Sequence, residues 1–359
     1  MIESIGRDLV QLVDTYSPTG KENQAVSLFN SYLRKCGATG IETDIAGNGL
    51  GEFEGDGMSV ILCGHIDTVP GKIPVKIKDG IVYGRGAVDA KSSLISLLYG
   101  AMIAKESGFK GSLKVIAAVG EEGTGKGILE VIRTQAKPDY AIFGEPSGVD
   151  GITLGYRGRL LIDIEFRAEP IHASAPWMGG SSVDAAITAW SRIRELYSGN
   201  TEFTKVSVAL TGIHGGGSNN KTPPKSKITI DARYPPTVIR DSILKEIAQV
   251  CDSLNLSVPP VIKIRSEVSP YVSSAKSPLA MVFRSAVFGK TGSNAKLIFK
   301  SGSGDMNILG NAWNIPMITY GPGNTNLSHT NHEHINIGDV QKSAEIVSEA
   351  LLRLEGGKG

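Results

Sequence analysis

Three short apolar segments near the start of the chain constrain its fold more than any other feature. They are MSVILCG (58–64), LKVIAAVG (113–120) and YAIFG (140–144), each bounded by glycine or charge. A long helical pattern, KSSLISLLYGAMIAKESG (91–108), separates the first two. Strands that are apolar on both faces and are joined through helices are typical of a parallel sheet covered by helices on both sides. The first part of the chain is therefore predicted to be α/β.

The middle of the chain has a different pattern. LLIDIEFRA (160–168), VSVALTG (206–212) and KITIDARYP (227–235) alternate apolar and polar residues with a period of two. This alternation predicts antiparallel strands with one exposed face. Helical patterns at 181–197 and 239–254 interleave with them. We expect a separate α+β domain here.

The last part of the chain returns to the pattern of the first. Strands are predicted near KLIFK (296–300) and MITYG (317–321), followed by a helix from Asp339 to Leu354. The expected organisation is one α/β domain with a mostly parallel sheet, interrupted by the smaller α+β domain. The predicted boundaries are 1–155 and 267–359 for the first domain and 156–266 for the second.

Charge and composition exclude several classes of partner. The chain has 37 basic and 36 acidic side chains, so no overall field attracts nucleic acid or an anionic membrane. No apolar run approaches the roughly 20 residues that span a bilayer, and the opening segment has the pattern of an amphipathic helix, unlike a signal peptide. Cys36, Cys63 and Cys251 form no CxxC pair, so buried free thiols are expected. These features predict a soluble cytoplasmic protein.

Four polar segments are expected to follow strands: GHIDTVPG (64–71), GRGAVDAKSS (84–93), GEEGTGKG (120–127) and GEPSG (144–148). Ligands of open α/β sheets bind at the carboxyl ends of the strands, so these segments are expected to converge. The groups brought together are His65, Asp67, Asp89, Glu121, Glu122 and Glu145. So many carboxylates cannot share a dry cleft unless cations neutralise them. Imidazole and carboxylate ligands without thiolate suit zinc, cobalt or manganese, and this number of ligands favours two ions.

Each of these signals has a structural alternative. The His65 segment could be a capped strand end, Glu121 and Glu122 a solvated loop, Asp89 a helix cap and Glu145 a turn residue. Their joint occurrence at four predicted strand ends favours the metal site. The segment 120–127 also resembles a phosphate loop, but it ends in glycine where serine or threonine should bind magnesium, and its two carboxylates would repel phosphate.

The four polar segments, in this order and spacing, resemble the M20 family of dinuclear zinc hydrolases over nearly the whole chain. The resemblance implies a metal-binding catalytic domain interrupted by a lid or dimerisation domain. It implies that Asp89 bridges two divalent ions, zinc or alternatively cobalt. Asp67 would orient a metal-ligating histidine, and Glu121 would be the general base. The implied metal ligands are His65, Asp89, Glu122, Glu145 and His329.

The choice of His329 rests on GPGNTNLSHTNHE (321–333), which is similar to a family signature in which a histidine precedes a glutamate by four residues. The glutamate would be Glu333 and the histidine His329. His332 and His334 are then left without a ligand role, and exposed loop positions are expected for both.

The resemblance also extends to substrate contacts. IHASAPWMGG (171–180) is similar to a family segment whose histidine reaches the active site of the partner subunit, which implies a homodimer and a substrate role for His172. Asn220 and Arg233 match family positions that contact substrate, and Arg233 could clamp a carboxylate. Gly302 and Ser303 lie in a segment that matches a loop near the substrate carboxylate.

Two short motifs, YRGR (156–159) and SGSGDMNI (301–308), are most similar to one branch of the family. That branch releases lysine or ornithine from an amino-group carrier protein of the LysW type, in which the amino acid is amide-linked to the carrier's C-terminal glutamate. It serves lysine and arginine biosynthesis. Removal of a small acyl group, as by acetylornithine deacetylase or succinyl-diaminopimelate desuccinylase, remains the alternative, and a non-enzymatic binding protein on the same fold would not need the complete ligand set.

Overall fold

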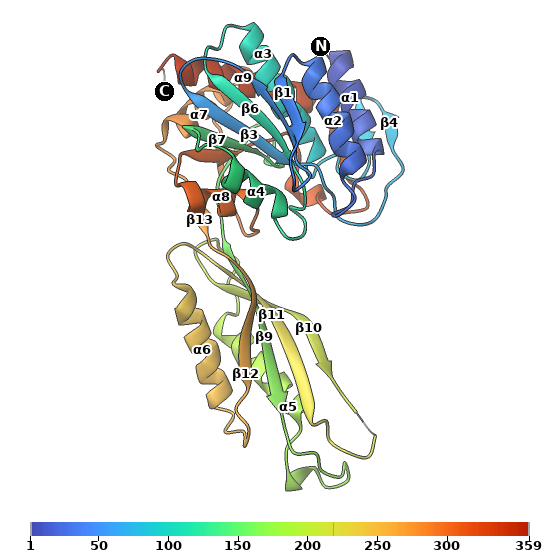
Figure 1. Cartoon of the computed structure of the whole chain (residues 1–359). Coiled ribbons are helices and arrows are strands. Elements are labelled where there is room, and N and C mark those ends of the chain that lie inside the picture. Colours follow the sequence, from blue (N-terminus) through green and yellow to red (C-terminus); the bar gives the residue numbers. More distant parts are fainter. Residues whose placement is uncertain (1, 218, 358–359) are drawn as a thin grey trace. The chain divides into compact units, whose positions relative to one another are not determined.

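The computed structural model describes residues 2–217 and 219–357, which form two compact units (Figure 1). Unit 1 runs to Gly155 and also includes Val272–Phe299 and the chain from Gly304 onward. Unit 2 comprises Tyr156–Tyr271 and Lys300–Ser303. A smaller domain therefore interrupts the first, as expected. It extends beyond the predicted range 156–266 by residues 267–271, and it also includes Lys300–Ser303, which the prediction had assigned to the first domain.

Unit 1 combines helices with a large sheet. Its α-helices are α1 (Ile2–Asp14), α2 (Asn23–Lys35), α3 (Lys91–Glu106), α4 (Lys126–Thr134), α7 (Pro278–Thr291), α8 (Asp305–Trp313) and α9 (Ile337–Glu355), and Thr325–Leu327 forms a short 3-10 helix. The strands that lie in it or end at its boundary are β1 (Thr39–Thr43), β2 (Gly49–Phe53), β3 (Ser59–His65), β4 (Lys76–Lys78), β5 (Ile81–Tyr83), β6 (Ser112–Ala118), β7 (Tyr140–Gly144), β8 (Gly151–Tyr156), β13 (Tyr271–Val272), β14 (Lys296–Lys300), β15 (Met317–Thr319) and β16 (His334–Asn336).

The large sheet has the strand order β1-β2-β6-β3-β7-β15-β8-β13, with β14 also paired to β8. Strands β6, β3, β7 and β15 run parallel at its centre. The antiparallel pairs lie towards the edges, where β2 joins β6 and β8 joins β15. The predicted mostly parallel sheet is confirmed.

Both faces of the central strands are buried. On β3, Val60 and Leu62 belong to the main apolar core, which also contains residues of α3 and α9. Ile61 and Cys63 point to the opposite face and are equally buried. Figure 1 shows α4 and α8 on that side of the sheet, and these two helices pack against each other. The continuous apolar strands seen in the sequence are explained by this double cover.

A small separate sheet, with the order β16-β5-β4, matters for the site. His334 pairs with Tyr83 and Ile335 with Val82, so residues just before β16 lie beside residues just after β5. The polar segment 84–93 therefore follows a strand of this small sheet and then enters α3. The prediction of a preceding strand is confirmed, but that strand is not part of the large sheet.

Unit 2 is an antiparallel sheet with helices on one face. Its strands are β9 (Gly158–Arg167), β10 (Ser207–Gly215), β11 (Lys225–Tyr234) and β12 (Val261–Val268), in the order β10-β11-β9-β12. Its helices are α5 (Ser182–Leu196) and α6 (Arg240–Asp252), and Pro176–Met178 forms a 3-10 helix. Alternate residues of β9, from Leu160 to Phe166, are buried with residues of both helices. The other face carries the polar residues, as the period of two predicts.

All three cysteines are buried and free, as expected. Among the helices of residues 2–217 and 219–357, none is long and apolar enough to cross a membrane.

Candidate metal centre

Three parallel strands of unit 1 deliver polar side chains to one edge of the sheet. His65 is the last residue of β3, Glu121 and Glu122 follow β6, and Glu145 follows β7. Because β6, β3 and β7 are neighbours and parallel, their carboxyl ends meet. The apolar strands thus end where charged groups begin.

The first group of potential ligands surrounds His65, whose side chain is 1% exposed. Its Nε2 lies 3.1 Å from Asp89 Oδ1 and 3.3 Å from Glu145 Oε1. One ligand atom from each of these three residues lies within 4.8 Å of the other two. One imidazole and two carboxylates form a donor set that zinc accepts.

The second group surrounds His329. Its Nε2 lies 2.7 Å from Glu122 Oε1 and 3.3 Å from Asp89 Oδ2. Ligand atoms of Asp89, Glu122 and His329 again lie within 4.8 Å of one another. Asp89 therefore turns one carboxylate oxygen to each group. A carboxylate shared in this way is the arrangement that two neighbouring cations require.

Asp67 connects His65 to the loop after β6. The Nδ1 of His65 lies 2.9 Å from the Asp67 carbonyl oxygen. The Asp67 carboxylate accepts hydrogen bonds from the Thr19 hydroxyl at 2.7 Å and from the amides of Glu121 and Glu122 at 3.1 and 3.2 Å. Burial opposes its ionisation, but His65 and these donors hold its pKa below the usual range. A phosphate loop would use backbone amides such as these to bind phosphate, but these two already donate to Asp67, which argues against that alternative.

The electrostatics of the centre favour added positive charge. Burial by itself lowers the pKa of His65, but Glu145, Asp67 and Asp89 outweigh it and raise that pKa well above its usual value. Hydrogen bonds with Asp89 and Glu122 raise the pKa of His329 to about 10. The surrounding carboxylates thus favour a positive charge at both imidazoles, and metal ions would replace the protons there.

Glu121 also lies at the metal centre, but its side chain is not held there by a hydrogen bond to another described residue. Its carboxylate has no hydrogen-bond partner among residues 2–217 and 219–357, although a ligand atom of Glu121 lies within 4.8 Å of ligand atoms of His65 and Glu122. Burial raises its pKa well above the usual range, and the negative charges of Glu145 and Asp305 add to the effect. A β-carbon at Gly304 would lie 3.1 Å from Glu121 Oε1, so this glycine leaves room for the carboxylate.

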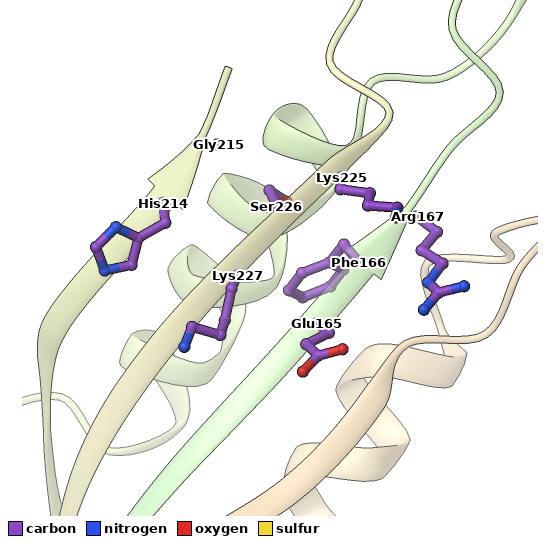
Figure 2. A pocket seen from close by; sticks show the side chains of 8 residues that line it. All are labelled: Glu165, Phe166, Arg167, His214, Gly215, Lys225, Ser226 and Lys227. Atoms are coloured by element: carbon purple, nitrogen blue, oxygen red, sulfur yellow. The ribbon is translucent and has the colours of Figure 1, made fainter. Parts of the chain in front are cut away.

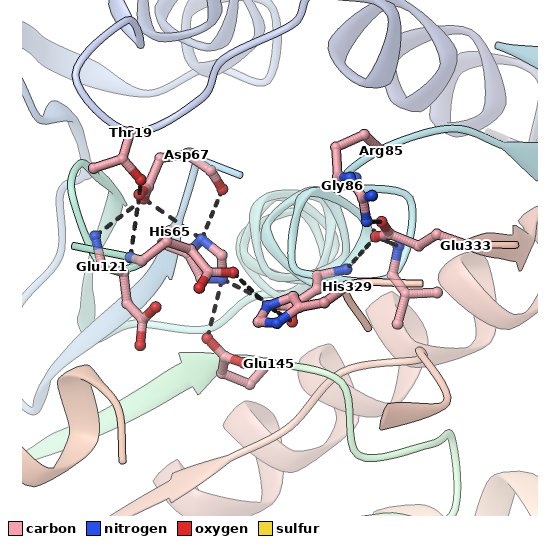
Figure 3. Close-up of polar contacts among 12 residues, drawn as sticks. Thr19, His65, Asp67, Arg85, Gly86, Glu121, Glu145, His329 and Glu333 are labelled. Atoms are coloured by element: carbon pink, nitrogen blue, oxygen red, sulfur yellow. Dashed lines mark hydrogen bonds and ion pairs between the residues drawn. The ribbon is translucent and has the colours of Figure 1, made fainter. Parts of the chain in front are cut away.

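Two residues that the sequence did not single out as site residues hold the loop of Asp89. The carboxylate of Glu333, 1% exposed, accepts hydrogen bonds from the backbone amides of Gly86, Val88 and Asp89 at 3.0, 2.9 and 3.0 Å. Its second oxygen binds Arg85 Nη1 at 2.9 Å (Figure 3). In the sequence, Glu333 served only to locate His329. The pairing of β16 with β5, which makes these contacts possible, left no strong local signal.

His332 and His334 belong to no potential metal group among the described residues. His332 is an exposed turn residue, as expected, but the expectation was wrong for His334, which is the half-buried first residue of β16. The ring of His334 packs near Tyr83, with the ring centroids 5.2 Å apart, and its Nδ1 lies 2.6 Å from the His332 carbonyl oxygen.

The expected substrate contacts of unit 2 fall into two pairs. The amide of Ala173 donates to the Asn220 carbonyl at 2.9 Å, and His172 bridges to Lys221, so His172 and Asn220 lie together. Arg233 lies near the other end of β11 and donates to the Ser303 hydroxyl at 3.2 Å. The nine residues from Lys225 to Arg233 are extended, and the eight steps between them separate the two pairs by roughly 27 Å or more within one chain. A side chain at Gly302 would meet nothing within 4 Å.

A pocket of about 370 Å³ also lies on the sheet of unit 2 (Figure 2). It contains none of the expected substrate residues. Its lining is Glu165, Phe166, Arg167, His214, Gly215, Lys225, Ser226 and Lys227.

The family follows from comparison with known proteins. A family model described as Peptidase family M20/M25/M40 matches residues 61–353. The chain belongs to this family. As an M20 member it is a metal-dependent amide hydrolase, and the expectation drawn from the sequence motifs is confirmed.

Individual relatives agree with the family. The chain is 33% identical over 335 residues to a [LysW]-lysine/[LysW]-ornithine hydrolase of Sulfurisphaera tokodaii, which covers 92% of this chain and 90% of the relative. The fold of this chain matches that of a tripeptidase from Staphylococcus aureus with a TM-score of 0.86 at 20% identity, over 99% of this chain and 98% of the tripeptidase. It also matches a dinuclear metal-binding M20 peptidase from Bacillus subtilis with a TM-score of 0.77 at 14% identity, over 99% and 98%.

The donor set of this M20 chain fits two metal ions. Two histidines and three carboxylates form two groups that share Asp89, and no thiolate takes part. The raised pKa values of His65 and His329 indicate the same need for cations.

Proposed function

We propose that the protein hydrolyses the amide bond that joins lysine or ornithine to the C-terminal glutamate of a LysW-type carrier protein. The observation that supports a two-metal hydrolase most directly is the shared carboxylate of Asp89, with one oxygen turned to each ligand group. The choice of substrate is supported by the [LysW]-lysine/[LysW]-ornithine hydrolase of Sulfurisphaera tokodaii, to which the chain is 33% identical over most of both chains.

The proposed ligands are those that the geometry groups together. His65, Asp89 and Glu145 would hold one ion, and Asp89, Glu122 and His329 the other. Zinc suits these imidazole and carboxylate donors, and cobalt is the alternative. When bound, such ions polarise the amide carbonyl and make water more acidic. The remaining steps fall to the protein's own side chains.

Glu121 is proposed as the general base. Its carboxylate lies beside both ligand groups and has no competing hydrogen bond among the described residues. It would accept a proton from the attacking water and deliver it to the nitrogen of the departing amino acid. Asp67 would keep Glu121 in place through the amide of that residue, and would fix His65 with its carbonyl oxygen.

Unit 2 is proposed to bind the substrate. Arg233, with Gly302 and Ser303, would bind a substrate carboxylate. His172 and Asn220 would reach a substrate from the partner subunit of a homodimer. This function would place the protein in lysine and arginine biosynthesis in the cytoplasm, with the carrier protein as its macromolecular partner.

The test is a side-by-side assay of the purified protein, loaded with zinc or cobalt, on carrier-linked lysine, carrier-linked ornithine and N-acetylornithine. We expect kcat/KM for a carrier-linked substrate to exceed that for N-acetylornithine by at least about tenfold. A chelator should abolish the activity. The matched control is Glu121→Gln, which should retain two metal equivalents while kcat falls about 10²- to 10⁴-fold.

Two outcomes would contradict the proposal in different ways. Faster turnover of N-acetylornithine would favour the small-acyl alternative over the carrier. Full activity of Glu121→Gln would remove Glu121 as the base but would leave the substrate assignment standing.

A further inference from the structure

Two arginines of unit 2 lie directly opposite each other on neighbouring strands. In the antiparallel pair of β9 and β11, Arg159 is in register with Arg233. Residues that are directly opposite share one face of the sheet, and like charges in this position destabilise the pair. A fold that needed only stability would not favour this placement.

One carboxylate lies with the two guanidinium groups. Arg233 binds Asp231 twice, with Nε at 2.6 Å from Oδ1 and Nη2 at 3.2 Å from Oδ2. Arg159 Nε donates to Asp231 Oδ2 at 2.7 Å. Asp231 can neutralise one of the two arginines, so the pair keeps an excess positive charge. The pKa of Arg157 is lowered first by burial and then by the charge of Arg233.

The two arginines differ in the donors they have left. Arg233 also uses Nη1, which donates to the Ser303 hydroxyl, and that hydroxyl donates to the Arg157 carbonyl at 2.9 Å. Arg159 is anchored by Nε alone, and within the described part of the chain no acceptor lies at its Nη1 or Nη2. Its side chain is 36% exposed. A guanidinium fixed in this way presents two parallel N–H groups, which match a carboxylate.

We propose that Arg159 binds a second carboxylate of the substrate, beside the carboxylate that Arg233 is proposed to bind. This inference rests on the proposed function. A glutamate that gives one carboxyl group to an amide keeps its other carboxylate, and the attached lysine or ornithine keeps its own. The substrate is therefore anionic on both sides of the bond, whereas N-acetylornithine is anionic on the amino-acid side alone.

The test compares two carrier–lysine conjugates: the natural one, and one in which hydrogen replaces the free carboxylate of the terminal glutamate. Arg159→Gln should lower kcat/KM for the natural conjugate about tenfold to hundredfold, mainly through KM. It should lower kcat/KM for the modified conjugate far less. Arg159→Lys, which keeps the charge but loses the fork, should fall between the wild type and Arg159→Gln on the natural conjugate.

The matched control is Arg167→Gln, on the same strand and the same face, eight residues and roughly 27 Å away. Arg167 is exposed at the end of β9. This variant should keep the wild-type ratio between the two conjugates. Thermal unfolding of each variant, together with the KM-against-kcat split, separates lost binding from lost folding.

The outcomes distinguish this inference from the function on which it rests. If the wild type cleaves the natural conjugate and Arg159→Gln keeps the wild-type ratio between the conjugates, the inference is overturned and the function stands. If Arg159→Gln lowers kcat/KM for both conjugates equally, Arg159 does not bind the second carboxylate. If the wild type does not cleave the carrier conjugate at all, the proposed function fails, and the inference fails with it.

Discussion

Of the histidines at positions 329, 332 and 334, His329 alone lies in a group of potential metal ligands. Three of the six histidines lie between positions 329 and 334. His329 has a positive φ of 63°, which is uncommon for a residue other than glycine. Such a backbone conformation costs about 1–3 kcal/mol and persists only where its surroundings hold it. Its ring contacts Asp89 and Glu122, from distant parts of the chain. The histidines at 332 and 334 have no such contacts.

At the residue scale, we expect His329→Ala to lose one of two metal equivalents. The ligand group of Asp89, Glu122 and His329 would then consist of the two carboxylates alone. His332→Ala is the matched control and should retain both. Metal content after dialysis, measured by elemental analysis, provides the comparison. Equal metal content in the two variants would show that His329 is not a ligand.

At the scale of elements, the connection from β5 to α3 depends on a contact with the far end of the chain. Glu333 satisfies three backbone amides of this connection and pairs with Arg85. Arg85 also donates to the carbonyls of Gly71 and Thr330, so it ties three segments together. A buried carboxylate with four donors fixes the backbone that carries Asp89.

Glu333→Gln should therefore destabilise the protein by about 3–5 kcal/mol, because it leaves the buried Arg85 without its counter-charge. Urea unfolding measures this loss. Glu345→Gln is the control: it removes a more exposed partner, 3.0 Å from Lys290, and should cost within about 1 kcal/mol. A Glu333→Gln variant as stable as this control would show that the ion pair does not hold the loop.

At the scale of the whole molecule, the positions of His172 and Arg233 bear on assembly. Both are proposed to contact substrate, yet the length of β11 separates them by roughly 27 Å or more in one chain. A single active site can use both only if they come from two copies. We therefore expect a homodimer in which His172 acts on the partner's site.

Mixed dimers test this expectation. His172→Ala and Glu121→Gln should each have very low activity alone. In a dimer with one subunit of each kind, one site would combine an intact Glu121 with an intact His172. Random mixing should then restore about a quarter of the wild-type activity, since half of the dimers are mixed and each has one working site. Activity no higher than the sum of the separate variants would place His172 outside the shared site.

By itself, the sequence determined the class of the fold and the kinds of residue at the metal centre. Apolar runs such as 58–64 and 140–144 predict buried parallel strands, and the polar residues that follow them must meet because parallel strands end at one edge. These signals are local: a strand or helix records its environment in the period of its own residues.

Only the tertiary structure decided which distant residues support that centre. Glu333 holds the Asp89 loop because β16 pairs with β5, and each of these strands has only three residues, too few to show a period. Arg159 meets Arg233 because the register of β9 and β11 sets them opposite each other, and a shift of one residue would turn one of them to the other face. Register and pairing depend on contacts across the whole chain, so no single segment contains them.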